Sequence, residues 1–216
     1  MEILEVMEKR HSVRQYIDKP IEDDKKLMIK HLIKDINNEN DLNFQVFYDE
    51  PDCFNSLLAK YGRFKNVKNY ISLVGKKSED LEVNAGYYGE RIVLSLTEIG
   101  LNSCWVALTH GKTKAIVNKG EKEVIIIAFG YGVTEGKPHK SKSMADCCNY
   151  SLELPDWFIE GMKGAMLAPT AINQQKFFIT YKNDEAILSM KKGPCINIDK
   201  GIIKLHFELA SSRRCE

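Results

Sequence analysis

The chain has 216 residues, and its 44% hydrophobic content is enough for one large core or two closely packed halves. Its 31 basic residues balance 30 acidic ones, so a net charge of +1 provides no global field that would attract nucleic acid or an anionic membrane. No apolar run approaches the roughly 20 residues that cross a bilayer, and the acidic start MEILEVMEKR is unlike a secretory signal, so we expect a cytoplasmic protein.

Helices and strands alternate along the chain. Apolar residues at helical spacing predict helices over residues 3–9, 23–36, 54–61, 82–100, 155–167 and 199–212. Alternating or continuous apolar runs predict strands over residues 43–48, 69–75, 103–108, 123–132 and 176–181. The strand at 123–132 is apolar enough to lie in the centre of a sheet. A polar, lysine-rich connection at 134–146 leads to the second part of the chain.

Basic and hydroxyl side chains gather in RHSVRQY, residues 10–16. One interpretation is a solvated loop, which is what charged clusters usually are. The other is an anion site, because alternate residues of an extended segment point the same way and Arg10, Ser12 and Arg14 would then line one wall. Arginine forks and a hydroxyl are donors that suit phosphate oxygens.

A second polar stretch, APTAINQQKFF at residues 168–178, directly follows a predicted helix. Pro169 ends that helix, and Thr170 is placed to bond locally. The amides of Asn173 and Gln175 are suited either to stabilising the loop or to reading the edge of a planar heterocycle or a sugar-like chain.

Residues 30–48 and 163–181 align without a gap and share four identical positions. The matched pairs are Lys30 and Lys163, Asn40 and Asn173, Phe44 and Phe177, and Tyr48 and Tyr181. Two ordinary helix-strand units explain such matches as well as an internal repeat does. A true repeat would make the chain a pseudo-dimer of two related halves, each with a polar loop between its helix and its strand.

The six cysteines form neither a C-x-x-C pair nor a regular framework, so we expect reduced thiols. A zinc site of His139, Cys147 and Cys148 is the alternative, but adjacent cysteines are poorly spaced as a tetrahedral pair. We therefore expect no metal.

Taken together, four segments resemble motifs of the nitroreductase family of FMN-dependent oxidoreductases. RHSVRQY resembles the family's Arg-x-Ser-x-Arg/Lys-x-Phe/Tyr element, and APTAINQQKFF resembles Ala-Pro-Ser-x-x-Asn-x-Gln-Pro-Trp, with threonine for serine, Lys176 for proline and Phe177 for tryptophan. EIGLNSCWV is similar to Gly-Leu-Gly-Ser-Cys-Trp, and FGYG followed by KPHKSK is similar to Gly-Tyr-Pro with trailing basic residues.

The resemblance implies an α+β nitroreductase-like sandwich, in which helices flank a central, mostly antiparallel sheet. It implies FMN as cofactor, NADH or NADPH as electron donor, and a nitroaromatic, a quinone or a similar small electrophile as acceptor in a ping-pong cycle. The alternative functions are a flavin-sequestering protein with little turnover and a specialised flavin chemistry. The FMN-binding residues implied are Arg10, His11, Ser12, Arg14, Ala107, Leu108, Lys140, Lys142, Pro169, Thr170, Asn173 and Gln175. No catalytic side chain is implied, because the flavin itself carries the hydride.

One departure from the family pattern concerns the order of the motifs. The family's Pro-Ser-x-x-Asn element follows the first helices, where this chain has DINNENDLNF without the proline and glutamine. The good copy lies at residues 169–175. We therefore expect a single domain over 1–216 with one FMN site between a first half, 1–150, and a second half, 151–216. A monomeric pseudo-dimer is the expected state, with a homodimer as the alternative.

Overall fold

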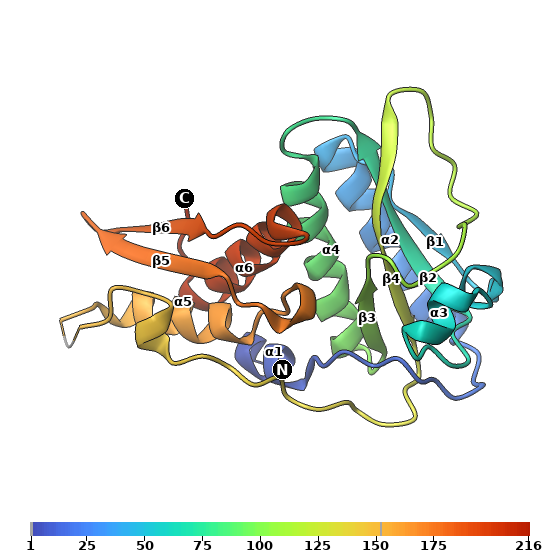
Figure 1. Cartoon of the computed structure of the whole chain (residues 1–216), viewed down its shortest axis with the longest axis horizontal. Helices are drawn as coiled ribbons and strands as arrows, with labels where there is room; N and C mark the ends of the chain where they lie inside the picture. Colours follow the sequence, from blue (N-terminus) through green and yellow to red (C-terminus); the bar gives the residue numbers. More distant parts are fainter. Residues whose placement is uncertain (1, 152) are drawn as a thin grey trace. The chain divides into compact units, whose positions relative to one another are not determined.

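The computed structural model describes residues 2–151 and 153–216, and its chain forms two compact units that interleave along the sequence. Unit 1 consists of the residues up to Glu8, Glu82–Arg91 and Pro138–Glu216. Unit 2 consists of Lys9–Leu81 and Ile92–Lys137. Helix α4, Leu81–Glu98, contributes to both units (Figure 1). The expected division at residue 150 stays a prediction.

A four-stranded antiparallel sheet forms the framework of unit 2. Its strands are β1 (Gln45–Phe47), β2 (Asn69–Lys76), β3 (Asn102–Val106) and β4 (Glu121–Gly130), in the order β1-β2-β4-β3. The expected central place of the apolar run at 123–132 is confirmed, because β4 pairs with β2 on one side and β3 on the other. Ala128 is opposite Tyr70 and Cys104, which fixes the register on both sides.

Unit 2 buries both faces of this sheet's central strands. On one face, Tyr70, Ile126 and Ala128 pack with Tyr16 and Phe54, near the short helices η1 (Asp52–Phe54) and α3 (Leu57–Tyr61). Side chains that point to the opposite face are fully buried as well, among them those of Ile71, Leu73, Ile127 and Phe129. The β-branched residues of β2 and β4 favour this extended, two-sided burial.

Helix α2 (Asp23–Asn40) is longer than the sequence predicted. The expected helix ended at Ile36, with a polar loop over DINNENDLNF, and this prediction is wrong because residues 37–40 continue the helix. Asn37 stabilises the end: its amide nitrogen donates to Phe44 O and its oxygen accepts from Phe44 N, both at 2.9 Å. Asn40, in the weaker repeat copy, is therefore in an α-helix, whereas its counterpart Asn173 ends the short turn Ala171–Asn173 with a positive φ of 55°.

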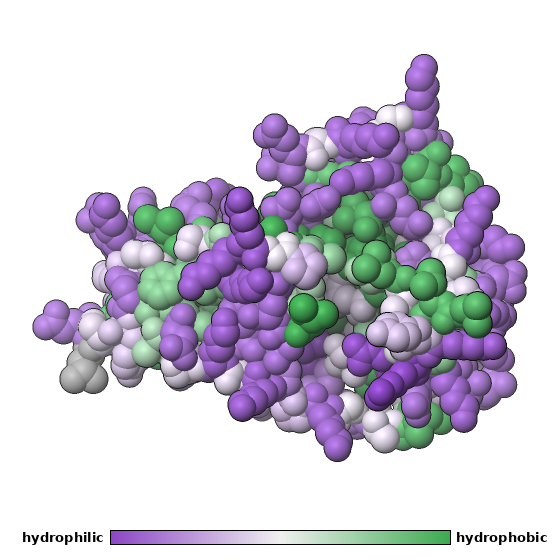
Figure 2. All heavy atoms as spheres, in the orientation of Figure 1, coloured by the Kyte–Doolittle hydropathy of each residue, from purple (hydrophilic) through white to green (hydrophobic). Residues whose placement is uncertain are grey.

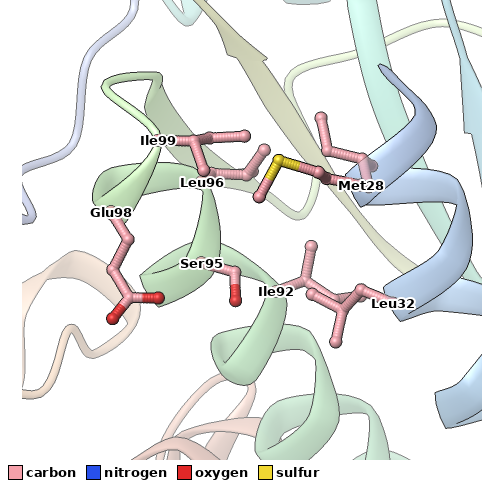
Figure 3. Close-up of a pocket in the computed structure, with 8 residues that line it drawn as sticks. Met28, Leu32, Ile92, Ser95, Leu96, Glu98 and Ile99 are labelled. Atoms are coloured by element: carbon pink, nitrogen blue, oxygen red, sulfur yellow. The ribbon is translucent and has the colours of Figure 1, made fainter. Parts of the chain in front are cut away.

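A shallow apolar hollow of about 160 Å³ lies between α2 and the unit 2 part of α4. Met28 and Leu32 of α2 face Ile92, Leu96 and Ile99 across it (Figure 3). None of the predicted site residues lines this hollow.

Unit 1 contains α5 (Asp156–Leu167), α6 (Ile196–Ser211) and a hairpin of β5 (Phe177–Lys182) and β6 (Glu185–Met190), together with all but the last residue of α1 (Ile3–Lys9). Figure 1 shows α5 beside α6 and the hairpin running along them. The short helices η2 (Met144–Asp146) and η3 (Ala171–Asn173) lie in its connections. The sequence did not predict β6.

Glycines allow α4 and α6 to approach closely in unit 1. A Cβ atom at Gly86 would collide with Ile198 O, and one at Gly201 would collide with Val83 O. This contact fixes the start of α6. The first turn of α6 carries Asp199, which contacts the second polar stretch. The architecture confirms the expected α+β class with mostly antiparallel strands.

All six cysteines are free thiols, and five of them are buried. None of the helices in the described part of the chain has the length and apolar character needed to span a membrane.

Candidate functional site

The basic segment of residues 10–16 runs alongside β3 in unit 2. Val13 N donates to Ser103 O at 2.9 Å, and Ser12 forms a parallel bridge with Ser103. Val13 and Tyr16 are buried beneath the segment, whereas Ser12 and Arg14 are exposed. The segment is therefore tied down by its apolar residues and presents its polar ones. The prediction of a single three-residue wall holds only in part, because the Arg10 side chain is 5% exposed.

The Cys104 thiol of β3 interacts electrostatically with the polar side chains of this segment. Burial raises the pKa of the Cys104 thiol, while the Arg14 guanidinium, a hydrogen bond with the Ser12 hydroxyl and Arg10 oppose that rise. Arg14 forms no salt bridge within the part of the chain that the structure describes, and its side chain is exposed. His11 lies apart from this group, with Nδ1 3.1 Å from Glu135 O.

The bend after β3 carries Ala107 and Leu108, which are both exposed. The next residue, Thr109, packs against the end of α3: a Cβ built on Gly62 would lie 2.6 Å from Thr109 Cβ. Leu108 is 82% exposed, as are Leu57 (83%) and Tyr61 (86%) on α3. Figure 2 shows apolar side chains in green over this part of unit 2. We call Leu57, Tyr61 and Leu108 the apolar rim.

Gln175 is the hydrogen-bonding centre of the second polar stretch, in unit 1. Its side chain is 3% exposed. Its Nε2 donates to Lys140 O at 2.8 Å and to Asn173 Oδ1 at 2.9 Å, and its Oε1 accepts from Lys142 N at 2.9 Å. Lys142 Nζ also donates to Gln175 O at 2.6 Å. These contacts show that the amide of Gln175 holds the loop together.

The other predicted residues of this loop are more accessible. Asn173 is exposed, and its Nδ2 donates to Lys140 O at 2.9 Å. Thr170 Oγ1 accepts from Gln175 N at 3.0 Å, which is the local bond expected of it, and Pro169 follows the end of α5. The structure thus brings Lys140 and Lys142 to the loop of Asn173 and Gln175.

Asp199, in the first turn of α6, lies outside the predicted site residues but accepts a hydrogen bond from Ala171 N. Sequence reasoning missed this residue because acidic residues are common in the first turn of a helix. His139 Nε2 lies 3.1 Å from Met166 O, and the described residues contain no group of three or more ligands arranged to hold a metal ion.

Comparison with protein families gives a match to one described as "Putative TM nitroreductase", over residues 2–211. The chain belongs to this family. It is therefore an oxidoreductase of the nitroreductase type. A search of curated proteins found no match.

Solved structures agree with the family. A "putative nitroreductase" from Thermotoga maritima is 26% identical with a TM-score of 0.69, and the match covers 97% of this chain and 83% of that one. A "putative nitroreductase in complex with FMN" from Desulfovibrio desulfuricans is 18% identical with a TM-score of 0.53, covering 72% of this chain and 98% of that one. A "Putative NADH Oxidase" from Clostridium acetobutylicum is 19% identical with a TM-score of 0.53, and the match covers 69% of this chain and 99% of that one. The last two likenesses show the shared fold.

Proposed function

We propose that the chain is an FMN-dependent oxidoreductase that takes electrons from NADH or NADPH and passes them to a nitroaromatic, a quinone or a similar small electrophile in a ping-pong cycle. The observation that carries this proposal is the position of the basic segment beside β3, fixed by the bond from Val13 N to Ser103 O. Two segments that resemble separate motifs of the nitroreductases therefore adjoin within unit 2. The FMN held by the Desulfovibrio desulfuricans neighbour supports the choice of cofactor.

The exposed groups of the basic segment fit a phosphate. The Arg14 guanidinium supplies two parallel N–H donors and the Ser12 hydroxyl a third, and both side chains are accessible to solvent. Arg10, which is largely buried, adds positive charge behind them. We assign Arg14 and Ser12 to the FMN phosphate, and we expect Lys140, whose side chain is exposed, to add further positive charge.

The second polar stretch fits a polar ring edge or a ribityl chain through Asn173. That amide uses one of its two N–H donors on Lys140 O and accepts from Gln175, so one donor stays available to a ligand. Both N–H donors of Gln175 are used inside the loop. We therefore assign Asn173 to flavin contact, and Gln175 and Lys142 to holding the loop.

When bound, FMN supplies a ring that accepts a hydride from a nicotinamide and gives electrons to a second substrate. The chain's part is to bind, orient and shield that ring. Ala107 and Leu108 would offer backbone N–H groups to the ring, and such donors favour negative charge that develops there. The apolar rim would offer a planar, poorly hydrated acceptor a surface to pack on.

An anaerobic titration tests the proposal. We expect the purified protein to bind FMN near one per chain, and NADH or NADPH to bleach the flavin absorbance stoichiometrically. A nitroaromatic or a quinone added afterwards should restore it. A yellow protein whose absorbance neither nucleotide changes would instead support a flavin-sequestering role. Failure to bind FMN would contradict both.

A further inference from the structure

Asp199 is a buried carboxylate that the proposed function does not use. It lies in the first turn of α6, within unit 1, and its side chain is 2% exposed. Its backbone N–H donates to Cys195 O at 3.0 Å, so its position on the helix is fixed. A buried charge without a ligand-binding or structural task would be costly to retain.

The carboxylate reaches across to the second polar stretch. Oδ1 accepts from Ala171 N at 2.9 Å, and Oδ2 accepts from the Gln174 side-chain Nε2 at 2.7 Å. The same Nε2 donates to Pro194 O at 2.8 Å. Gln174 Oε1 is buried without a hydrogen-bond partner among the described residues. The orientation of Gln174 is therefore set by its two acceptors, one of which is Asp199.

The loop that Asp199 holds has an unfavourable backbone. Three residues of the loop have positive φ angles: Ile172 (49°), Asn173 (55°) and Gln175 (42°). These angles lie in the left-handed region of the backbone, which residues other than glycine seldom adopt. Such a conformation persists only where surrounding contacts fix it. Gln175 fixes the loop from the side of Lys140 and Lys142, and Asp199 fixes it from the side of α6.

We propose that Asp199 is a positioning residue for the loop Thr170–Gln175, and that gain or loss of one proton on its carboxylate changes how firmly the loop is held. The consequence for flavin rests on the proposed function, because it requires Asn173 of this loop to contact FMN. The holding of the loop itself does not depend on any ligand.

The direction of the proton effect follows from burial. Burial raises the pKa of Asp199 from 3.8 to about 6, against the opposing donors of Ala171 and Gln174. Loop opening would expose the carboxylate and return its pKa toward the ordinary value. The closed loop therefore binds a proton more tightly than the open loop, and closure becomes more favourable as the pH falls through about 6. Above that pH the ionised carboxylate still holds the loop through its two hydrogen bonds, but less firmly than the protonated group does.

The groups near Asp199 include hydrogen-bond donors that oppose the rise in its pKa, and burial outweighs them. The loop supplies neutral donors, namely Ala171 N–H and the Gln174 amide. The turn before α6 supplies the Cys195 thiol, whose pKa is raised by burial, then by Asp199 and by Glu82 of α4. The loop's end carries Lys176, whose ammonium donates to Lys192 O, and α6 continues with Lys200.

Hydrogen exchange of the flavin-free protein tests this inference. After correction for intrinsic exchange rates, we expect the amides of residues 171–175 to open about tenfold less at pH 5 than at pH 7.5. Asp199→Asn should abolish that pH dependence. Asp199→Ala, which removes both acceptors, should increase loop opening at least tenfold at pH 7.5, while exchange of β2 and β4 stays unchanged. Asp156→Asn, an exposed first-turn acid of α5, should behave as the unaltered protein.

Outcomes for the two proposals are separable. Unchanged loop exchange in Asp199→Ala, or a pH dependence retained in Asp199→Asn, would overturn the role of Asp199 whatever happens to flavin. If loop exchange changes as expected, the role of Asp199 stands. FMN affinity of Asp199→Ala then tests the other proposal: we expect it to fall, and an unchanged affinity would remove the loop from the flavin site.

Discussion

His206 Nε2 lies 2.9 Å from Glu90 Oε1, and both side chains are completely buried. His206 Nδ1 is 3.1 Å from Gly164 O, so one imidazole of α6 joins α4 to α5 inside unit 1. Gly164 O is purely an acceptor, and therefore Nδ1 carries a proton toward it. The imidazole thus links three helices of unit 1, of which α5 precedes the second polar stretch and α6 contacts it through Asp199.

This pair gives the first prediction. Removing one partner leaves the other polar group buried, so we expect His206→Leu to lower the free energy of unfolding by about 3–5 kcal/mol. The double variant His206→Leu Glu90→Met replaces both groups by apolar ones and should recover more than half of that loss. Urea denaturation of both variants measures this. A double variant whose loss in the free energy of unfolding equals the sum of the two single-variant losses would contradict this prediction.

The second prediction concerns Gln175. Leucine has a similar shape but cannot make the bonds to Lys140, Asn173 and Lys142, so Gln175→Leu leaves buried polar groups unsatisfied. We expect a loss of about 1–3 kcal/mol in the free energy of unfolding and weaker FMN binding. Gln15→Leu, at an exposed position of the basic segment, is the control and should leave stability within about 0.5 kcal/mol. Equal stabilities for the two variants would show that the loop does not depend on Gln175.

The third prediction concerns Ile172. This β-branched residue has a φ of 49° and is 87% exposed, so it strains the backbone without contributing to the core. Asparagine tolerates the left-handed region better, and we expect Ile172→Asn to raise the free energy of unfolding by about 0.5–1 kcal/mol. Ile187→Asn, on β6 and 39% exposed, should instead lower it. Thermal denaturation compares the two, and a destabilised Ile172→Asn would show that the left-handed backbone is not costly.

Most elements of the fold were predictable because their apolar patterns are strong. The run at 123–132 and the helix at 82–100 are long enough to leave little ambiguity, and both were confirmed. Strand β6 was missed because EAILSM is short and its apolar residues 186–188 are consecutive, so the sequence does not show that Ile187 is exposed while Ala186 and Leu188 are buried. The last turn of α2 was missed because Asn37 is stabilised by Phe44, seven residues away, rather than by helix propensity.

Motif matching found the polar segments of the candidate site but not what holds them. Asp199 is 28 residues from Ala171 and 25 from Gln174 in the sequence, and no local pattern joins them. The burial of Arg10 could not be predicted from the sequence either, because alternation in an extended segment shows which way side chains point but not what covers them. Tertiary contacts decide both features.

The fourth prediction tests the phosphate assignment. A charge-assisted hydrogen bond contributes roughly 1.5–3 kcal/mol, so Arg14→Ala should weaken FMN binding about ten- to a hundredfold. Riboflavin lacks the phosphate, and its affinity should not change. Arg91→Ala removes an exposed arginine from α4 and controls for the loss of one positive charge. Fluorescence quenching measures the affinity of Arg14→Ala for FMN and for riboflavin, and that of Arg91→Ala for FMN. An equal loss for FMN and riboflavin would show that Arg14 does not bind the phosphate.

The last prediction follows from the order of the motifs in the sequence. The basic segment with Arg14 and the loop with Asn173 occur once each, so we expect a single FMN to require both from the same chain. Asn173→Ala removes a neutral hydrogen bond and should weaken FMN binding less than Arg14→Ala, while changing the flavin spectrum.

Co-expression of the two variants with different tags separates this prediction from a shared site. If one chain supplies Arg14 and a second chain supplies Asn173, the mixed dimer contains one intact site and one doubly defective site. It would then regain normal affinity at half the stoichiometry. If both residues come from the same chain, each site keeps one defect and no tight binding returns. We expect the second result in purified doubly tagged protein, with the singly tagged variants as controls. Recovery of tight FMN binding would instead establish an obligate dimer in which neighbouring chains complete each other's sites.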